Sequence, residues 1–285
     1  MPPLTPARIG LLGGTFNPPH IGHLAMARAA RERLGLNLVL LTPGGDPPHK
    51  TPAVCARQRL CMTRLAAWGQ PGVRAWAEEV RRPGVSYTAQ TLRQLQARHP
   101  GAALYFLIGA DALDSLPGWR GAEEIFALAH IVSFPRDGRD GAAAAAYLAR
   151  RGARVTRVEG DVPPVSSSQV RQDVAAGRPA AALVGEGVER YLYRHGLYLP
   201  PEEGAMLAAL RRALPHRDYV LAAEGARQAV HAAARTGGDG AAARRKAPHT
   251  PWSGKAGRMK SMRGAARPRS MASPVWCSLQ PGRAT

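Results

Sequence analysis

The sequence predicts an α/β protein with a doubly wound parallel sheet. Short apolar runs bounded by glycine or proline alternate with longer stretches of helical periodicity from residue 7 to about residue 199. Continuously apolar runs are typical of strands that are covered on both faces, and this alternation indicates βαβ units. The length of 285 residues is enough for one large domain with an appendage, and the 45% hydrophobic content allows a substantial core.

The apolar runs predict strands at residues 8–12, 38–42, 104–108, 130–134 and 154–158, with 73–77 as a weaker candidate. The periodic stretches predict helices at residues 24–34, 54–68, 89–98, 122–128, 142–151 and 168–176. Right-handed crossovers place the loops after the strands along one edge of the sheet. Open α/β sheets bind their ligands at that edge.

The character of the chain changes after Pro200, so we expect a domain at residues 1–203 and an extension at 204–285. Residues 202–235 have the pattern of one or two helices, for instance 205–214 and 220–234. Beyond Thr236 the sequence is rich in Gly, Pro, Ala and Arg without periodicity, and such composition predicts disorder.

The net charge of +19 is concentrated in this extension. The first 203 residues carry a balance of +7, and the last 82 carry +12. An RNA or an acidic protein as partner of the extension is therefore an alternative function of a different class. The extension has few aromatic side chains for base stacking (Tyr219, Trp252 and Trp276) and matches no RNA-binding module. Nucleic-acid binding is disfavoured, and we interpret the charge as nonspecific.

Cysteine usage and hydropathy favour a cytoplasmic protein. Cys55, Cys61 and Cys277 are too few for a disulfide framework, and Cys55 and Cys61 lack His or Cys neighbours at metal-binding spacing. The first residues lack the pattern of a secretory signal, and no apolar stretch reaches the ~20 residues that cross a bilayer. We expect no membrane association and no protein-bound metal.

The segment at residues 13–23, GGTFNPPHIGH, directly follows the first predicted strand. Gly13 and Gly14 allow a tight turn and a close approach of a ligand to the backbone. His20 and His23 are three residues apart at a predicted helix start, so both rings can lie on one face. Two imidazole donors and free helix N–H groups form a site suited to a phosphate chain.

A second anion site is predicted at residues 165–171, VSSSQVR. Hydroxyl residues begin a helix after a Pro-Pro stop, and Arg171 lies in the first turn. A guanidinium fork is suited to phosphate oxygens. The alternative is that Ser167 or Ser168 serves only as a helix N-cap.

The first segment resembles the signature of the HxGH nucleotidyltransferases. Three further segments are similar to bacterial nicotinate-nucleotide adenylyltransferases: PPHK at 47–50, SYTAQTL at 86–92, and FLIGADAL at 106–113 followed by LPGW at 116–119. VSSSQVR resembles the family's ISSTxIR element, with Val for Ile and Ser for Thr. The resemblance spans about residues 7–199. It implies a Rossmann-like nucleotidyltransferase fold and adenylyl transfer from ATP to nicotinate mononucleotide, giving deamido-NAD and pyrophosphate.

The resemblance also implies roles for individual residues. The catalytic residues are expected to be His20, His23, Lys50 and Arg171. The ATP-binding residues are expected to be Gly13, Gly14, Thr15, Phe16, His20, His23, Ser166, Ser167, Ser168 and Arg171. The nicotinate mononucleotide is expected to contact Asn17, Lys50, Tyr87, Thr88, Asp111 and Trp119. Mg²⁺ is expected on the triphosphate, held by phosphate oxygens and water.

Each acceptor residue also has an ordinary structural interpretation. Trp119 resembles a ring that stacks on the pyridinium, but it could pack in the core. Thr88 could receive the nicotinate carboxylate or cap a helix, and Asp111 could hold a ribose or adenylate group or cap a helix at 112–116. Nothing near Thr88 in the sequence is acidic, which favours a substrate with a carboxylate.

Two alternatives concern related enzymes. A sister nucleotidyltransferase could act on phosphopantetheine, which the SYTAQTL and PGW segments disfavour, or on nicotinamide mononucleotide.

Residues 210–230 faintly resemble the opening of an HD-type phosphohydrolase domain. Because the extension lacks a His-Asp pair, we interpret it as a remnant of such a domain.

Overall fold

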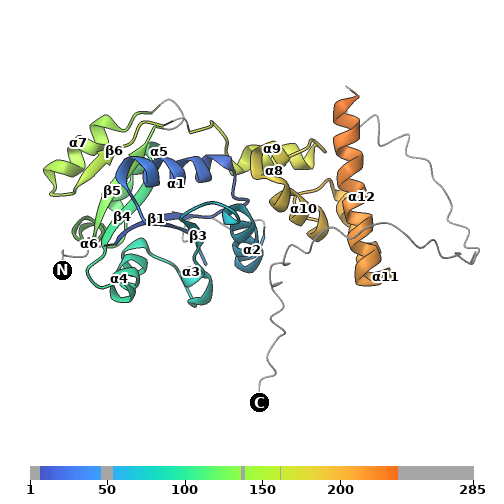
Figure 1. The fold of residues 1–285 in the computed structure, drawn as a ribbon, viewed down its shortest axis with the longest axis horizontal. Coiled ribbons are helices and arrows are strands. Elements are labelled where there is room, and N and C mark those ends of the chain that lie inside the picture. Colours follow the sequence, from blue (N-terminus) through green and yellow to red (C-terminus); the bar gives the residue numbers. More distant parts are fainter. Residues whose placement is uncertain (1–6, 46–53, 136–138, 161, 237–285) are drawn as a thin grey trace, which may run out of the picture.

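A computed structural model describes residues 7–45, 54–135, 139–160 and 162–236. Its centre is a six-stranded sheet in the order β3-β2-β1-β4-β5-β6, and every neighbouring pair is parallel (Figure 1). The strands are β1 (Arg8–Gly14), β2 (Leu38–Pro43), β3 (Val73–Ala75), β4 (Ala103–Gly109), β5 (Ala129–Phe134) and β6 (Val155–Arg157). The strand order reverses between β1 and β4, so the predicted doubly wound sheet is confirmed.

All six predicted strands are present, including the weaker candidate. That candidate is β3, an edge strand whose Val73 is fully buried while Arg74 is exposed. The four central strands are buried along nearly their whole length, as continuous apolar runs indicate.

The six predicted helices occur within three residues of their expected bounds. They are α1 (Ile21–Leu34), α2 (Ala56–Ala67), α4 (Thr88–Arg98), α6 (Ala122–Leu128), α7 (Ala142–Arg150) and α8 (Ser167–Ala175). One core cluster joins α1 to the sheet, and a second joins α4 and α6 to it. Figure 1 shows α1 and α4 on opposite sides of the sheet.

Several short elements within residues 7–199 were absent from the predicted strands and helices, although a short helix at 112–116 was considered as the one that Asp111 could cap. They are α3 (Glu78–Arg81), α5 (Ala110–Leu113), the 3-10 turn η1 (Leu116–Gly118), α9 (Ala181–Val184) and α10 (Glu186–His195). Four of these have at most four residues, which is too short for a helical period to be visible. The fifth, α10, buries Val188, Leu192 and Tyr193 between charged residues.

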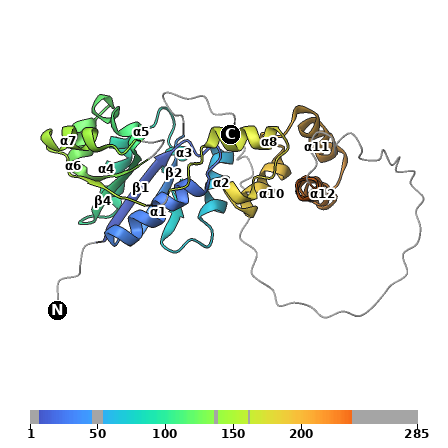
Figure 2. The same ribbon diagram turned by 90° about the horizontal axis from the view of Figure 1, so that it is seen from above.

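The third core cluster lies beside the sheet and is made mostly of helices. It combines α2, α8, α9 and α10 with α11 (Pro201–Ala213) and α12 (His216–Arg235). Figure 2 shows α2 between the sheet and α10, with α11 and α12 beyond. Tyr219 of α12 is buried, and its hydroxyl donates to the carbonyl of Arg194. It is therefore not available to stack on a base.

A buried carboxylate ties α12 to the rest of this cluster. Glu189 is 0% exposed, and its Oε1 accepts the N–H groups of Ala180 (2.7 Å) and Ala181 (2.9 Å). Its Oε2 accepts from Arg227 Nη1 (2.9 Å) and His231 Nε2 (2.7 Å) of α12. Burial alone would raise the pKa of Glu189, but the hydrogen bonds from His231 and Arg227 hold it below its ordinary value of 4.5.

The predicted disorder after Thr236 falls on residues outside the described ranges. Trp252, Trp276 and Cys277 also lie outside them. Among the helices that the structure describes, none combines the length and the apolar character needed to cross a bilayer.

We expect Arg227→Ala to lower the free energy of unfolding by about 3 kcal/mol, because a buried carboxylate loses its charged partner. The control is Arg217→Ala, which removes an exposed arginine of the same helix. Urea denaturation of both variants measures the difference. Because the pKa of Glu189 is depressed in the folded protein, its contribution is present above pH 4.5 and is lost as the pH falls through the folded pKa. A loss for Arg227→Ala no larger than the control's at pH 7 would contradict the buried pairing.

Candidate active site

The candidate site lies where the strand order reverses. The loops that follow β1 and β4 emerge there from neighbouring strands at the same edge of the sheet. The first loop leads into the start of α1, which carries the histidine pair, and Asp111 and Trp119 follow β4 in the same way. The predicted nucleotide and acceptor elements therefore meet at one edge.

The backbone at the end of β1 is open above Gly13. A Cβ added at Gly13 would meet no heavy atom within 4 Å. At Gly14 the same atom would stand 3.3 Å from the ring of Phe16, which is buried beneath the turn with a φ of 49°. A ligand can thus approach the backbone at Gly13 without obstruction.

The structure brings the rings of His20 and His23 together. Their centroids are 3.8 Å apart, and the His23 ring lies 4.7 Å from that of Phe16. His20 is the N-cap residue of α1 and is 3% exposed. The N–H of His20 donates to Nδ1 of His23 (3.2 Å). Because Nδ1 accepts, the neutral His23 ring carries its proton on Nε2, where it is available as a donor.

Gly22 separates the two histidines and limits the space around them. A Cβ at this position would stand 3.0 Å from Nδ1 and 3.1 Å from Cε1 of His20, and 3.3 Å from the carbonyl oxygen of Pro163. Glycine therefore allows the His20 ring to lie against the start of α1.

The second predicted phosphate element packs on the first. Ser167 Oγ donates to the carbonyl of Pro18 (2.8 Å), and Arg171 Nη1 donates to that of Asn17 (2.8 Å). Arg171 Nη2 donates to Ser168 Oγ (3.1 Å). The N-cap of α8 is Ser166, whose Oγ accepts the N–H of Gln169 (3.1 Å). The alternative that Ser167 or Ser168 caps the helix was wrong, because Ser166 is the cap and the other two hydroxyls contact the Pro18 carbonyl and Arg171.

Two positioning residues were missed in the sequence. Arg59 of α2 is 1% exposed, and its guanidinium donates to the carbonyls of Thr15 (2.8 Å) and Gly45 (2.9 Å). It joins the loop after β1 to the loop after β2. Tyr198 donates its hydroxyl to Oδ1 of Asn17, and burial raises the pKa of this phenol, which keeps it protonated.

Both residues left a weak signal. Arg59 lies within the buried stripe of α2, next to Leu60 and in line with Thr63, where a charged residue is unusual. Tyr198 is the last residue of the Gly-Leu-Tyr segment at which the resemblance ends. Its φ of 61°, which is rare for a tyrosine, is visible only in the structure.

On the acceptor side, two capping interpretations are excluded. Thr88 is the first residue of α4, whose N-cap is Tyr87, and no side chain caps this helix. Asp111 lies in the first turn of α5, which begins after Gly109 without a side-chain cap. Trp119 is half-buried, donates Nε1–H to Ser115 Oγ (3.0 Å) and meets the Phe106 ring edge-on at 6.1 Å.

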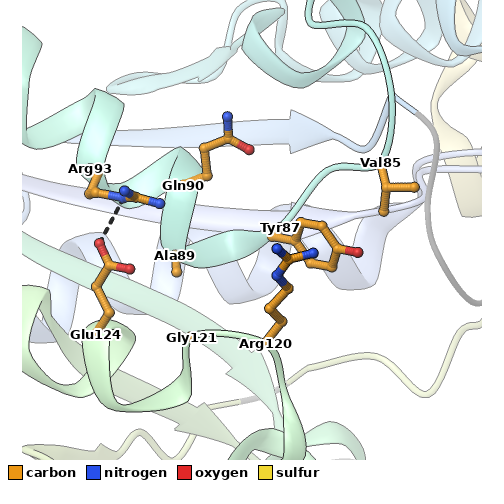
Figure 3. Close-up of a pocket in the computed structure, with 8 residues that line it drawn as sticks. All are labelled: Val85, Tyr87, Ala89, Gln90, Arg93, Arg120, Gly121 and Glu124. Carbon is orange, nitrogen blue, oxygen red and sulfur yellow. Dashed lines mark ion pairs between the residues drawn. The ribbon is translucent and has the colours of Figure 1, made fainter.

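A pocket of about 420 Å³ opens between the starts of α4 and α6 (Figure 3). It is lined by Val85, Tyr87, Ala89, Gln90, Arg93, Arg120, Gly121 and Glu124. The guanidinium carbon of Arg120 lies 4.8 Å from the centroid of the Tyr87 ring. Glu124 brings a carboxylate to the pocket that Tyr87 and Ala89, the neighbours of Thr88, also line, which the sequence did not indicate. Its Oε1 is paired with Nε of Arg93 at 2.7 Å.

Lys50, together with His49 and the PPHK segment, lies outside the described residues. Among the residues that are described, no three His, Cys, Asp or Glu side chains converge in a way that could hold a metal ion.

Comparisons with known proteins identify the family of the chain. Residues 11–173 match the family model described as cytidylyltransferase-like. Two curated relatives are each described as "Probable nicotinate-nucleotide adenylyltransferase". The one from Gloeobacter violaceus is 43% identical over 200 residues, covering 68% of this chain and 97% of the relative. The one from Saccharopolyspora erythraea is 39% identical over 200 residues, covering 70% of this chain and 92% of the relative.

The fold is also similar to that of the Plasmodium falciparum nicotinic acid mononucleotide adenylyltransferase solved in complex with NaAD. The TM-score is 0.57 at 14% identity, over 67% of this chain and 97% of that one. The chain belongs to the cytidylyltransferase-like family and, with the curated relatives that it matches, to the nicotinate-nucleotide adenylyltransferases.

Proposed function

We propose that this site transfers the adenylyl group of ATP to nicotinate mononucleotide through the paired imidazoles of His20 and His23. The products are deamido-NAD and pyrophosphate, and the reaction belongs to NAD biosynthesis. The chain's membership of the adenylyltransferase family supports the reaction. The observation that carries the residue assignment is the convergence of His20, His23, Ser167 and Arg171 on one turn at the sheet reversal.

The chemistry requires alignment and charge stabilisation rather than a covalent intermediate. An oxygen of the acceptor's 5′-phosphate forms a bond to the α-phosphorus of ATP, and the bond from that phosphorus to the bridging oxygen breaks, releasing pyrophosphate. The attacking oxygen is already an anion, so no base has to activate it. His20 and His23 donate to the α- and β-phosphate oxygens, and Lys50 and Arg171 neutralise the β,γ end.

The remaining ATP contacts come from the two loop elements. We propose that Gly13, Gly14, Thr15 and Phe16 form the backbone wall, and that the hydroxyls at 166–168 face the triphosphate. The open space above Gly13 supports the first proposal. Arg171 would exchange its contact with Ser168 for a phosphate oxygen when the nucleotide binds, since a charged acceptor makes a stronger hydrogen bond than a hydroxyl.

The acceptor contacts are assigned to the loop after β4 and the start of α4. We propose that Trp119 stacks on the pyridinium, that Tyr87 and Thr88 lie near the carboxylate, and that Asp111, Asn17 and Lys50 hold the ribose and phosphate. The pocket beside Tyr87 supports this arrangement, and Trp119 keeps part of its surface exposed although it packs against the core. Asn17 has a fixed orientation because Tyr198 donates to its Oδ1.

An adenylyltransferase that uses ATP depends on a divalent cation, and we propose that this ion is Mg²⁺. We propose that phosphate oxygens and water hold this ion on the triphosphate, since Mg²⁺ usually keeps several waters and binds substrate phosphates. When bound, the ion would neutralise charge on the phosphate oxygens. The protein residues orient the chain of phosphates around it.

We also propose a cytoplasmic location, because three cysteines are too few for a disulfide framework. Residues 1–203 are proposed as the catalytic domain. We propose that α11 and α12 stabilise it through the contacts of α12 with Glu189. The origin of the extension at 204–285 as a remnant of an HD-type domain stays a prediction.

The decisive experiment is pyrophosphate release from ATP with one acceptor at a time. We expect release with nicotinate mononucleotide, weaker release with nicotinamide mononucleotide, and none with phosphopantetheine. Mass spectrometry of the product should identify deamido-NAD. Release with phosphopantetheine alone would replace the proposed acceptor.

His23→Ala should lower kcat by a hundredfold or more, because loss of one preorganised donor raises the barrier by about 2.7–4 kcal/mol. The control is His99→Ala, an exposed histidine at the end of α4. Circular dichroism should show both variants folded. Near-normal turnover of a folded His23→Ala protein would refute the role of this imidazole.

The variant Gly22→Ala distinguishes an effect on the position of the His20 ring from an effect on the stability of α1. The added methyl group would press on the His20 ring, and we expect kcat to fall by about tenfold through this displacement. The helix itself should gain, since alanine favours helix by about 1 kcal/mol over glycine. Gly225→Ala is the matched control, because its Cβ would meet nothing within 4 Å in α12. Equal activity of the two variants would contradict a tight His20 site.

A further inference from the structure

The pocket between α4 and α6 combines apolar and charged lining residues. A Cβ on Gly121 would come within 2.8 Å of the Cβ of Ala89, so the two helices approach closely at that point. Val85, which is 39% exposed, and the ring of Tyr87 add apolar surface to the walls. A cavity with such surfaces is suited to one flat ring.

The charges that line this pocket do not cancel. The positive charge of Arg93 is neutralised by Glu124, whose carboxylate it contacts at 2.7 Å. Arg120 instead lies over the Tyr87 ring, and no carboxylate of the described residues forms an ion pair with it. Figure 3 shows the two arginines on different sides of the pocket, with only Arg93 joined to Glu124. The lining therefore carries one uncompensated positive charge.

We propose that the guanidinium of Arg120, held by its stacking on Tyr87, is a specificity-determining group that pairs with the carboxylate on the acceptor's pyridine ring. This inference rests on the proposed function and deepens it. A nicotinamide ring carries a neutral amide at the same position and gains no ion pair. Arg120 thus selects the acid over the amide.

The position of Arg120 in the fold agrees with this role. It follows Trp119, the proposed stacking residue, in the loop after β4. Strand β4 is the neighbour of β1, which leads to the histidine pair. A mononucleotide bound with its ring near Arg120 would extend its phosphate along the sheet edge toward His20 and His23.

Stacking on Tyr87 also explains why arginine suits this position. A planar guanidinium retains a free edge while its face lies on an aromatic ring, so it can offer two parallel N–H donors to a carboxylate. Lysine would supply the charge without that geometry. Tyr87 acts as a positioning residue because it holds the guanidinium at the pocket wall.

The test compares kcat/KM for nicotinate and nicotinamide mononucleotides in Arg120→Gln. We expect the ratio of the two values to fall about tenfold, the lower range for a hydrogen bond to a charged group. The change should appear mainly in KM for the nicotinate substrate, with the values for nicotinamide mononucleotide and ATP unchanged. Arg120→Lys should recover part of the preference.

Two further variants serve as controls. Arg33→Gln removes an exposed charge at the far end of α1, and it should leave the ratio unchanged. Glu124→Gln releases Arg93 and makes the pocket more positive, so the preference for the nicotinate substrate should hold or rise. A ratio in Arg120→Gln that matches the wild type would overturn the inference and leave Arg120 as an ordinary surface arginine.

Calorimetric dissociation constants for the two mononucleotides provide a readout that does not depend on turnover. If the wild type released no pyrophosphate but bound the nicotinate form with a preference that Arg120→Gln abolished, the proposed function would fail and the inference would stand. If the wild type turned over and Arg120→Gln kept its binding preference, only the inference would fail.

Discussion

The site depends on how the turn after β1 is fixed. Three of its carbonyl groups accept hydrogen bonds from side chains of other helices: Thr15 from Arg59 of α2, and Asn17 and Pro18 from Arg171 and Ser167 of α8. Pro18 and Pro19 have no N–H to donate, so the turn makes few regular backbone hydrogen bonds of its own. These side chains supply them, and two of the three are cations. The same contacts that hold the turn therefore place positive charge around the histidine pair.

This arrangement also links the third core cluster to the site. Arg59 and Arg171 lie on α2 and α8, which both contribute apolar residues to that cluster. Tyr198 lies just after α10 and fixes Asn17 from the other side. The helices beyond the sheet thus act as a support against which the nucleotide-binding turn is held, and α12 completes that support through Glu189.

Much of this could be predicted from the sequence because it is local. Buried strands have continuous apolar runs, and the order of glycine, proline and histidine at residues 13–23 indicates a turn and a helix start. The contacts of Arg59 and Tyr198 are not local, since Tyr198 and Asn17 are 181 residues apart. Glu124 was missed for the same reason, because helix packing, not sequence distance, brings it to the pocket that Tyr87 and Ala89 also line. The cap at Ser166 was misplaced by one or two residues within a run of three serines, which the sequence alone does not distinguish.

The contacts of Glu189 have a consequence for the folding of the protein as it is synthesised on the ribosome. Its two partners on α12, Arg227 and His231, follow it by 38 and 42 residues. During translation the carboxylate leaves the ribosome well before either partner, and α9 and α10 cannot bury it at low cost until α12 has followed. Completion of this part of the protein is thereby coupled to synthesis of its last described helix, and a nascent chain that stops short of it retains a hydrated, unburied acid.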